Sequence, residues 1–142
     1  MKRFAALLAG LGLFVFLAGG AYAADDSLSI AANAAFLAKN ARQPGVNIRP
    51  SGLQYKIIKS GFGKRPGPRD SVTCYYKGQL INGKVFDATE PGFPANFTVN
   101  ALIPGWTEAL ELMREGDRWE LVVPANLAYG ERGAGDGNIP PN

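Results

Sequence analysis

The sequence predicts an α+β fold in which a short helix packs on one face of an antiparallel β-sheet. Apolar and polar residues alternate over 53–58, 71–77 and 119–123, as expected of strands with one buried face. Between the last two of these strands, apolar residues recur at helical spacing over 103–113. The chain of 142 residues also contains 18 glycines and 10 prolines, which favours strands joined by turns over a helical bundle.

The first predicted strand covers residues 53–58, and a loop rich in glycine and proline follows it over 61–68. The second predicted strand, 71–77, contains the adjacent Tyr75 and Tyr76. Because successive side chains of a strand point to opposite faces, only one of these tyrosines is expected to face the core.

A tight turn is predicted at Asn82-Gly83, a dipeptide typical of two-residue hairpin loops. Apolar pairs flank it at 80–81 and 85–86, so these segments are expected to form a β-hairpin. A further short strand is predicted at 97–99.

The helix is predicted to begin near Pro104, which suits a first helical turn, and to end at Gly116. A tryptophan on the apolar stripe of a helix is by itself most simply a core residue. After the strand at 119–123, Pro124 opens a glycine-rich loop that runs to Asn142. The apolar stripe of the helix consists of Ile103, Trp106, Leu110 and Met113.

The first 23 residues have the pattern of a signal peptide. Lys2 and Arg3 precede an apolar run over 4–17, and Ala21-Tyr22-Ala23 fits the small residues required before a cleavage site. We therefore expect cleavage after Ala23 and a location in the periplasm or outside the cell. The competing interpretation is a retained membrane anchor, for which the run is short because a spanning helix needs about 20 residues.

The mature chain is expected to have two parts, an N-terminal helix and linker over 24–50 and a globular domain over 51–142. The helix is predicted over 27–42, with basic residues near its C-terminal end that suit the helix dipole. A linker rich in proline and glycine follows over 43–52. We interpret the helix as a tether; a dimerisation arm and a fragment of a chaperone module are the alternatives.

Composition excludes several classes of function. Without residues 1–23 the net charge falls from +3 to +1, so nucleic-acid binding has no electrostatic support. The chain has no histidine, which excludes histidine-based acid–base catalysis and histidine metal sites. Its single cysteine, Cys74, lies on a predicted strand and is expected to be a buried structural thiol, since no histidine can activate it.

Six segments occur in an order and spacing that are specific together: Ser-Gly-Leu-Gln-Tyr (51–55), Tyr-Lys-Gly (76–78), Asn-Gly-Lys-Val-Phe-Asp (82–87), Ile-Pro-Gly-Trp-Thr-Glu-Ala-Leu (103–110), Leu-Ala-Tyr-Gly (127–130) and Ile-Pro-Pro-Asn (139–142). With them the chain resembles FKBP-type peptidyl-prolyl cis-trans isomerases, in particular the exported bacterial, Mip-like branch. The resemblance implies a curved antiparallel sheet wrapped around a short helix, with an apolar pocket between them.

The resemblance also implies the residues of the pocket. Those implied to be catalytic are Tyr76, Phe86, Asp87, Trp106 and Tyr129. Those implied to bind substrate are Phe97, Leu102, Ile103 and Ile139. In this scheme Trp106 forms the floor under a proline ring, and Tyr76 is the inward-facing tyrosine of its pair because it belongs to the Tyr-Lys-Gly segment.

The implied function is acceleration of rotation about X-Pro bonds during the folding of exported proteins. Its partners would be proline-containing polypeptides, with no cofactor, no metal, no nucleic acid and no stable membrane insertion after cleavage. The alternatives are a non-catalytic chaperone or proline-peptide binding module that uses the same pocket, and an accessory domain with a vestigial pocket. Asp87 and Glu90 could suggest glycoside hydrolysis, but a turn-capping aspartate beside a solvated glutamate is the simpler interpretation.

The chain departs from the family pattern at its end. Family domains continue past the Ile-Pro-Pro-Asn segment into another strand in the middle of the sheet, so this sequence predicts a fragment or truncated chain in which the last strand is missing. Ala95 and Asn138 also stand where larger apolar side chains are common, which predicts a more open and polar pocket rim.

Overall fold

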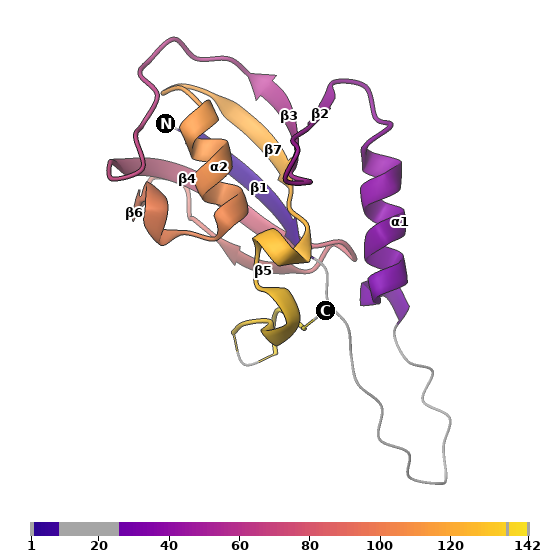
Figure 1. Cartoon of the computed structure of the whole chain (residues 1–142). Coiled ribbons are helices and arrows are strands. Elements are labelled where there is room, and N and C mark those ends of the chain that lie inside the picture. The colour runs from indigo at the N-terminus through magenta and orange to yellow at the C-terminus, as the bar shows by residue number, and fades with distance from the viewer. Residues whose placement is uncertain (1, 9–25, 136, 142) are drawn as a thin grey trace, which may run out of the picture.

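A computed structural model describes residues 2–8, 26–135 and 137–141 of the chain. The described residues form a seven-stranded sheet with the helix α2 across one face and the helix α1 beside it (Figure 1). The helices are α1 (Ile30–Asn40) and α2 (Pro104–Leu112), and the strands are β1 (Lys2–Leu8), β2 (Val46–Ile48), β3 (Gln54–Lys59), β4 (Ser71–Leu80), β5 (Val85–Ala88), β6 (Ala95–Thr98) and β7 (Arg118–Val122).

The strand order is β2-β3-β7-β1-β4-β5, and β6 also pairs with β4. All these pairs are antiparallel except those of β1, which runs parallel to both of its neighbours. After β7 the described residues contain short 3-10 turns and no further strand of the sheet. The α+β prediction of an antiparallel sheet with a short packed helix is thus confirmed.

The core lies between α2 and the sheet, as the alternation in the strands and the helical spacing of apolar residues over 103–113 predict. Trp106 and Leu110 of α2 are buried, and Met113 at the end of the helix is completely buried. They pack with inward-facing strand residues such as Cys74 and Leu121, which are also completely buried. The expected burial of the Cys74 thiol is confirmed.

The predicted hairpin is the connection between β4 and β5. Gly83 has a φ of +91°, a left-handed conformation that favours glycine. The Leu80 N–H donates to the Lys84 carbonyl oxygen at 2.8 Å and closes the turn. This turn brings β5 back along β4 and so positions Phe86 and Asp87.

The N-terminal helix α1 is shorter than the predicted 27–42 and begins after Ser29, whose hydroxyl accepts from the Ala32 N–H at 3.0 Å. The buried Gln54 side chain attaches the helix to the sheet. Its amide nitrogen donates to the Leu37 carbonyl oxygen at 3.0 Å, and its amide oxygen accepts from the Asn40 side chain at 2.8 Å. The predicted linker 43–52 contains the strand β2, which the sequence did not indicate because three residues are too few to show alternation.

The strand β1 lies within residues 1–23, for which the sequence predicts a signal peptide and no strand. It pairs with β4 along its whole length and with β7 over most of it, so it fills the sheet position between these two strands (Figure 1). Pairing on both sides satisfies backbone groups of β4 and β7 that would otherwise face a gap. Of the predicted apolar run 4–17, residues 9–17 lie outside the described residues, and none of the described helices is long and apolar enough to cross a bilayer.

Removal of residues 1–23 is expected to lower the urea midpoint of unfolding, because the facing edges of β4 and β7 lose their partner. The substitution Ala5→Pro tests the pairing itself. Ala5 stands opposite Lys77 of β4 and Glu120 of β7, and a proline there removes a backbone donor from the centre of the sheet. Ala5→Val is the control that keeps the donor. Equal urea midpoints for the proline and valine variants would contradict the pairing.

Candidate functional site: an aromatic pocket between α2 and the sheet

The first turns of α2 and the strands that face them enclose a pocket of about 110 Å³, here called the aromatic pocket. Strands β4, β5 and β6 supply one wall, and α2 with the turn before it supplies the floor. The loop after β7 contributes the remaining side. The lining residues are Tyr76, Gly78, Phe86, Asp87, Phe97, Leu102, Ile103, Trp106 and Tyr129.

Trp106 is positioned by the start of α2. Pro104 occupies the first turn, where its missing N–H costs no helical hydrogen bond. A Cβ on Gly105 would lie 2.5 Å from Cγ1 of Val123, so glycine at this position lets the helix approach the residue that follows β7. The Thr107 hydroxyl donates to the Val99 carbonyl oxygen at 2.7 Å and fixes the preceding turn. The indole is consequently held at the floor of the pocket with 7% of the residue exposed.

Three aromatic rings meet edge to face around the floor. The Tyr76 and Trp106 ring centroids are 5.1 Å apart at an interplanar angle of 81°. Phe97 approaches Trp106 at 5.9 Å and 85°, and Tyr76 at 5.7 Å and 63°. Such pairs contribute about 0.5–1.5 kcal/mol each beyond the area they bury. The three rings therefore brace one another and keep the face of the indole in a fixed orientation.

A second aromatic pair stands at the other side of the pocket. Phe86 and Tyr129 have ring centroids 6.5 Å apart at 87°. Gly78 lies beneath Phe86, because a Cβ on Gly78 would come within 2.6 Å of Cζ of that ring. Sequence reasoning did not select Gly78 as a site residue, although a glycine inside a strand pattern is a signal of close approach by another group.

The substitution Gly78→Ala is expected to weaken binding of a small apolar ring in the aromatic pocket about tenfold, since the added methyl group must displace the Phe86 ring from the pocket wall. Far-UV circular dichroism should stay unchanged because the Gly78 backbone is not in the left-handed region. Gly92→Ser is the contrasting variant. A side chain there meets nothing within 4 Å, but the backbone at Gly92 has a φ of +84° that is strained for any other residue, so stability falls while binding per folded molecule is retained. Unchanged binding by Gly78→Ala would contradict the placement of Phe86.

The polar groups of the pocket are two phenols and one carboxylate. The Tyr76 hydroxyl donates a hydrogen bond to Oδ2 of Asp87. Burial, and then this hydrogen bond to the carboxylate, raise the pKa of Tyr76 above its ordinary range. Burial, followed by the nearby Asp87 charge, also raises the pKa of Tyr129. Both hydroxyls are thus neutral hydrogen-bond donors at neutral pH.

The raised pKa values of Tyr76 and Tyr129 predict a loss of stability in alkali. A tyrosine in the unfolded chain ionises at about pH 10, so the unfolded chain releases these protons at a lower pH than the folded chain does. The stabilisation that these two tyrosines contribute is complete below that pH and declines as the pH rises further. Urea midpoints measured at several pH values should fall above about pH 10, and the fall should be smaller in Tyr76→Phe. An identical decline in the variant would contradict the assignment.

Eight of the nine residues implied by the resemblance line the aromatic pocket together. The exception is Ile139, which is buried in the core with 6% exposed. It pairs with Ala134 through two backbone hydrogen bonds of 2.9 and 3.0 Å, which close the loop behind Tyr129. The choice between the adjacent tyrosines also agrees with the structure, because Tyr76 lies in the pocket and Tyr75 on the opposite face of the sheet.

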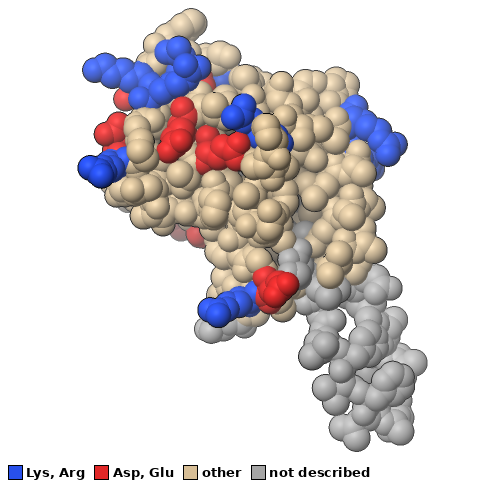
Figure 2. Space-filling view, viewed as in Figure 1, with Lys and Arg blue, Asp and Glu red and all other residues tan. Residues whose placement is uncertain are grey.

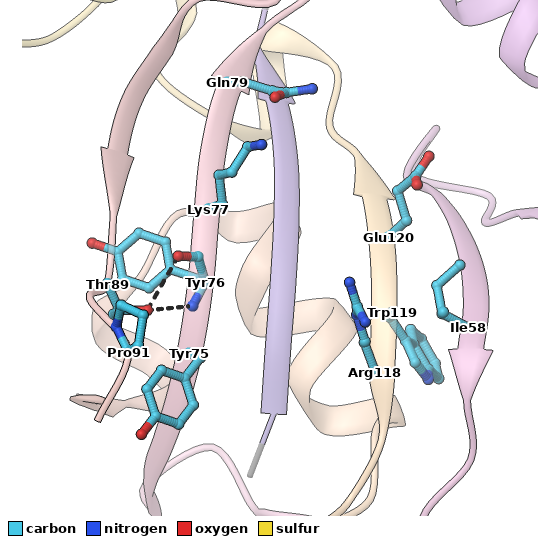
Figure 3. A pocket seen from close by; sticks show the side chains of 10 residues that line it. All are labelled: Ile58, Tyr75, Tyr76, Lys77, Gln79, Thr89, Pro91, Arg118, Trp119 and Glu120. Carbon is cyan, nitrogen blue, oxygen red and sulfur yellow. Dashed lines mark hydrogen bonds between the residues drawn. The ribbon is translucent and has the colours of Figure 1, made fainter. Parts of the chain in front are cut away.

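The opposite face carries a wider hollow of about 420 Å³, shown in Figure 3. In that view β1 passes between β4 and β7, and the side chains on either side stand apart instead of converging on one point. The Tyr76 N–H donates to the Thr89 hydroxyl oxygen at 3.0 Å, a hydrogen bond at the edge of the sheet. The hollow is lined by Ile58, Tyr75, Tyr76, Lys77, Gln79, Thr89, Pro91, Arg118, Trp119 and Glu120.

The aromatic pocket can therefore bind a small apolar ring against the indole, with neutral donors at its edge. No cluster of three or more histidine, cysteine or acidic residues suited to a metal ion occurs in the described part of the chain. The thiol of Cys74 is completely buried and is not among the lining groups. The arrangement of the lining residues is suited to non-covalent binding of an apolar group.

Comparison with known protein families gives two matches. Residues 63–142 match the family described as "FKBP-type peptidyl-prolyl cis-trans isomerase". Residues 21–57 match the family described as "Domain amino terminal to FKBP-type peptidyl-prolyl isomerase". The first match contains all the residues of the aromatic pocket.

Individual proteins show the same likeness. The chain is 58% identical over 109 residues to the outer membrane protein MIP of Legionella longbeachae, covering 76% of this chain and 46% of that protein. It is 52% identical over 107 residues to the FKBP-type 22 kDa peptidyl-prolyl cis-trans isomerase of Escherichia coli, covering 75% of this chain and 52% of the relative. The chain thus spans about half the length of these curated relatives. Among solved structures, a peptidyl-prolyl cis-trans isomerase from Pseudomonas syringae matches with a TM-score of 0.74 at 36% identity, covering 83% of this chain and 86% of that one.

Proposed function

Because this chain belongs to the FKBP-type peptidyl-prolyl cis-trans isomerase family, we propose that it accelerates rotation about X-Pro peptide bonds in other polypeptides. The observation that carries the proposal is the aromatic pocket itself. A proline ring fits the small apolar space over Trp106, and the edge-to-face contacts with Tyr76 and Phe97 hold that indole in place.

Rotation about an X-Pro bond does not require a reactive side chain in the enzyme. Amide resonance gives the X-Pro bond a rotational barrier of roughly 18–20 kcal/mol, so uncatalysed exchange takes tens to hundreds of seconds. No covalent bond breaks, and catalysis requires only that the twisted amide be bound better than the planar one. Twisting reduces the charge separation across the C–N bond. A dry aromatic pocket therefore disfavours the planar, more polar amide relative to the twisted one.

We assign roles to the lining residues on this basis. Trp106 is the floor for the proline ring, and Tyr76, Phe86 and Phe97 are its aromatic walls. The backbone N–H of Ile103 and the neutral Tyr129 hydroxyl bind substrate carbonyl oxygens and hold the peptide near the twisted geometry. Asp87 holds the Tyr76 hydroxyl and offers a polar contact at the edge. Leu102 adds apolar surface, and Ile139 supports the loop of Tyr129 from the core.

A protease-coupled assay on a short X-Pro peptide tests the proposal. The chain should increase the rate at which the cis peptide becomes cleavable, in proportion to its concentration. The alternative function, a chaperone or binding module that uses the same pocket, predicts peptide binding without acceleration. Absence of both binding and acceleration would contradict any use of the aromatic pocket.

We further propose that the chain is exported, with a signal peptide at 1–23, a helix and linker at 24–50 and the isomerase domain at 51–142. The charge and apolar pattern of the first residues supports this organisation. Cleavage would remove β1, so the strand belongs to the uncleaved chain. N-terminal sequencing of the chain recovered from the periplasm or culture medium should begin at Ala24. A chain that retains Met1 and stays in the cytoplasm would contradict export.

A further inference from the structure

The connection between β3 and β4 presents the most exposed large apolar side chain of the described residues. Phe62 is 98% exposed and stands between Gly61 and Gly63. Single exposed apolar residues are ordinary on protein surfaces. Phe62 differs because the backbone on both sides of it is fixed to the body of the domain.

The glycines beside Phe62 pack against the turn that follows α2. The Gly61 N–H donates to Oδ1 of the buried Asp117 at 2.5 Å, and the Gly63 N–H donates to the Glu115 carbonyl oxygen at 3.1 Å. A Cβ on Gly61 would lie 2.2 Å from that same carbonyl oxygen, so only glycine fits there. The ring of Phe62 is therefore held away from the domain by a braced loop.

Basic side chains surround the exposed ring. Residues 59–69 contain four lysines or arginines and no acidic residue, and all four are exposed: Lys59, Lys64, Arg65 and Arg69. Figure 2 shows blue side chains projecting at the upper left, where Figure 1 places the β3–β4 connection, with red carboxylates below them.

The neighbouring carboxylates are engaged by the backbone of the same loop. Oε2 of Glu115 accepts from the Lys64 N–H at 3.4 Å, and Oδ2 of Asp70 accepts from the Gly67 N–H at 2.7 Å. The salt bridge found among the described residues joins Arg49 to Glu108, away from this loop. Arg65 donates from Nε to the Leu112 carbonyl oxygen at 3.0 Å, but among the described residues no carboxylate forms a salt bridge with any of the four cations. Their charge is therefore available to an external anionic partner.

We propose that this loop, residues 59–69, is a contact site for the surface of an anionic lipid bilayer. One protruding aromatic ring can enter the interfacial region while the cations around it lie at the level of the lipid headgroups. A protein partner is less well matched, because protein interfaces bury an anchor at the centre of a broad packed patch and Phe62 has almost no packed surroundings.

The site is separate from the aromatic pocket. The loop packs on residues 114–117 beyond the C-terminal end of α2, whereas the pocket is built on Ile103 and Trp106 at its N-terminal end. Binding to a bilayer through the loop would leave the pocket open to substrate. Membrane binding and isomerase activity can therefore be measured independently on the same variants.

Co-sedimentation of the full chain with vesicles of phosphatidylethanolamine and phosphatidylglycerol tests the site. Phe62→Ser is expected to lower partitioning about tenfold. The matched control is Phe93→Ser, which changes another exposed phenylalanine, 73% exposed, outside this loop and should leave partitioning within about twofold. The double substitution of Lys64 and Arg69 by Gln should weaken the salt-sensitive part of binding, unlike the same change at Lys77 and Lys84. The N-terminal apolar run is present in every variant, so its contribution to partitioning is the same on both sides of each comparison.

A local probe separates the loop from the rest of the chain. An environment-sensitive fluorophore on Phe62→Cys should shift to the blue with anionic vesicles and not with phosphatidylcholine vesicles, whereas the same label on Phe93→Cys should not respond. The native Cys74 is completely buried and escapes labelling. Equal responses at both positions, no effect of Phe62→Ser, or binding of polyglutamate in place of vesicles would each overturn the proposal. Isomerase activity on a short peptide should be unchanged in all loop variants.

Discussion

Replacing Trp106 with alanine is expected to lower kcat/KM for a short X-Pro peptide by about 100-fold, which corresponds to roughly 2.7 kcal/mol of lost transition-state binding. The substitution removes the surface on which the proline ring rests, and it frees the rings of Tyr76 and Phe97 that meet the indole edge to face. The measurement is the protease-coupled assay, with the folded fraction determined by circular dichroism.

Trp106 is also largely buried, so the alanine variant loses stability as well as activity. A large-to-small change of this kind costs about 3–5 kcal/mol, a sizeable share of the stability of a small domain. Trp106→Phe keeps an aromatic floor and should reduce kcat/KM only about tenfold while remaining folded. Trp119→Phe is the matched control, because that indole stacks on Tyr55 at 4.4 Å outside the aromatic pocket. Full activity in Trp106→Phe and Trp106→Ala would contradict the assigned floor.

Replacing Asp117 with alanine is expected to lower the free energy of unfolding by about 2–5 kcal/mol. Its buried carboxylate accepts from the Gly61 N–H at 2.5 Å and from the Arg114 N–H at 2.9 Å. Alanine leaves both donors without a partner and releases the β3–β4 connection from the turn after α2. Urea denaturation measures the loss directly.

Asp117→Asn is the informative companion, since the amide oxygen can replace only one of the two accepting oxygens. The free energy of unfolding of Asp117→Asn should lie between those of the parent chain and Asp117→Ala. A surface control is Asp70→Ala, whose carboxylate accepts one hydrogen bond, from the Gly67 N–H of an exposed turn, and whose loss should cost less than about 1 kcal/mol. Equal urea midpoints for Asp117→Ala and Asp70→Ala would contradict the bracing of the loop.

Local patterns were enough to predict most elements of the fold. The alternation over β3, β4 and β7 and the helical stripe of α2 each cover several residues, and the Asn82-Gly83 turn has a specific backbone requirement. The strand β2 was not predicted because it has three residues and depends on pairing with β3. The strand β1 was not predicted because its pairing is parallel and joins segments far apart in the sequence. Local periodicity in the sequence cannot indicate such pairing.

The aromatic pocket was predicted through family resemblance, and the residues alone could not have supplied it. Periodicity placed Trp106 on an inward face, which is equally true of ordinary core residues such as Leu110. Tyr76 was chosen over Tyr75 through the Tyr-Lys-Gly segment and not through alternation. Gly78 was missed because its role is to make room for Phe86, a contact that depends on the β4–β5 register. Asp117 was missed because its hydrogen bonds join it to backbone groups that include a residue 56 positions away.

The proposed function depends on the claim that the proline ring of the substrate lies over Trp106 in the aromatic pocket. Intermolecular nuclear Overhauser effects measure this position directly. With a short X-Pro peptide bound to the full chain, the protons of the proline ring should show cross-relaxation with the indole of Trp106 and with the rings of Tyr76 and Phe97. Cross-relaxation with Tyr75 or with Pro91 instead would place the peptide in the hollow on the opposite face of the sheet and would contradict the account.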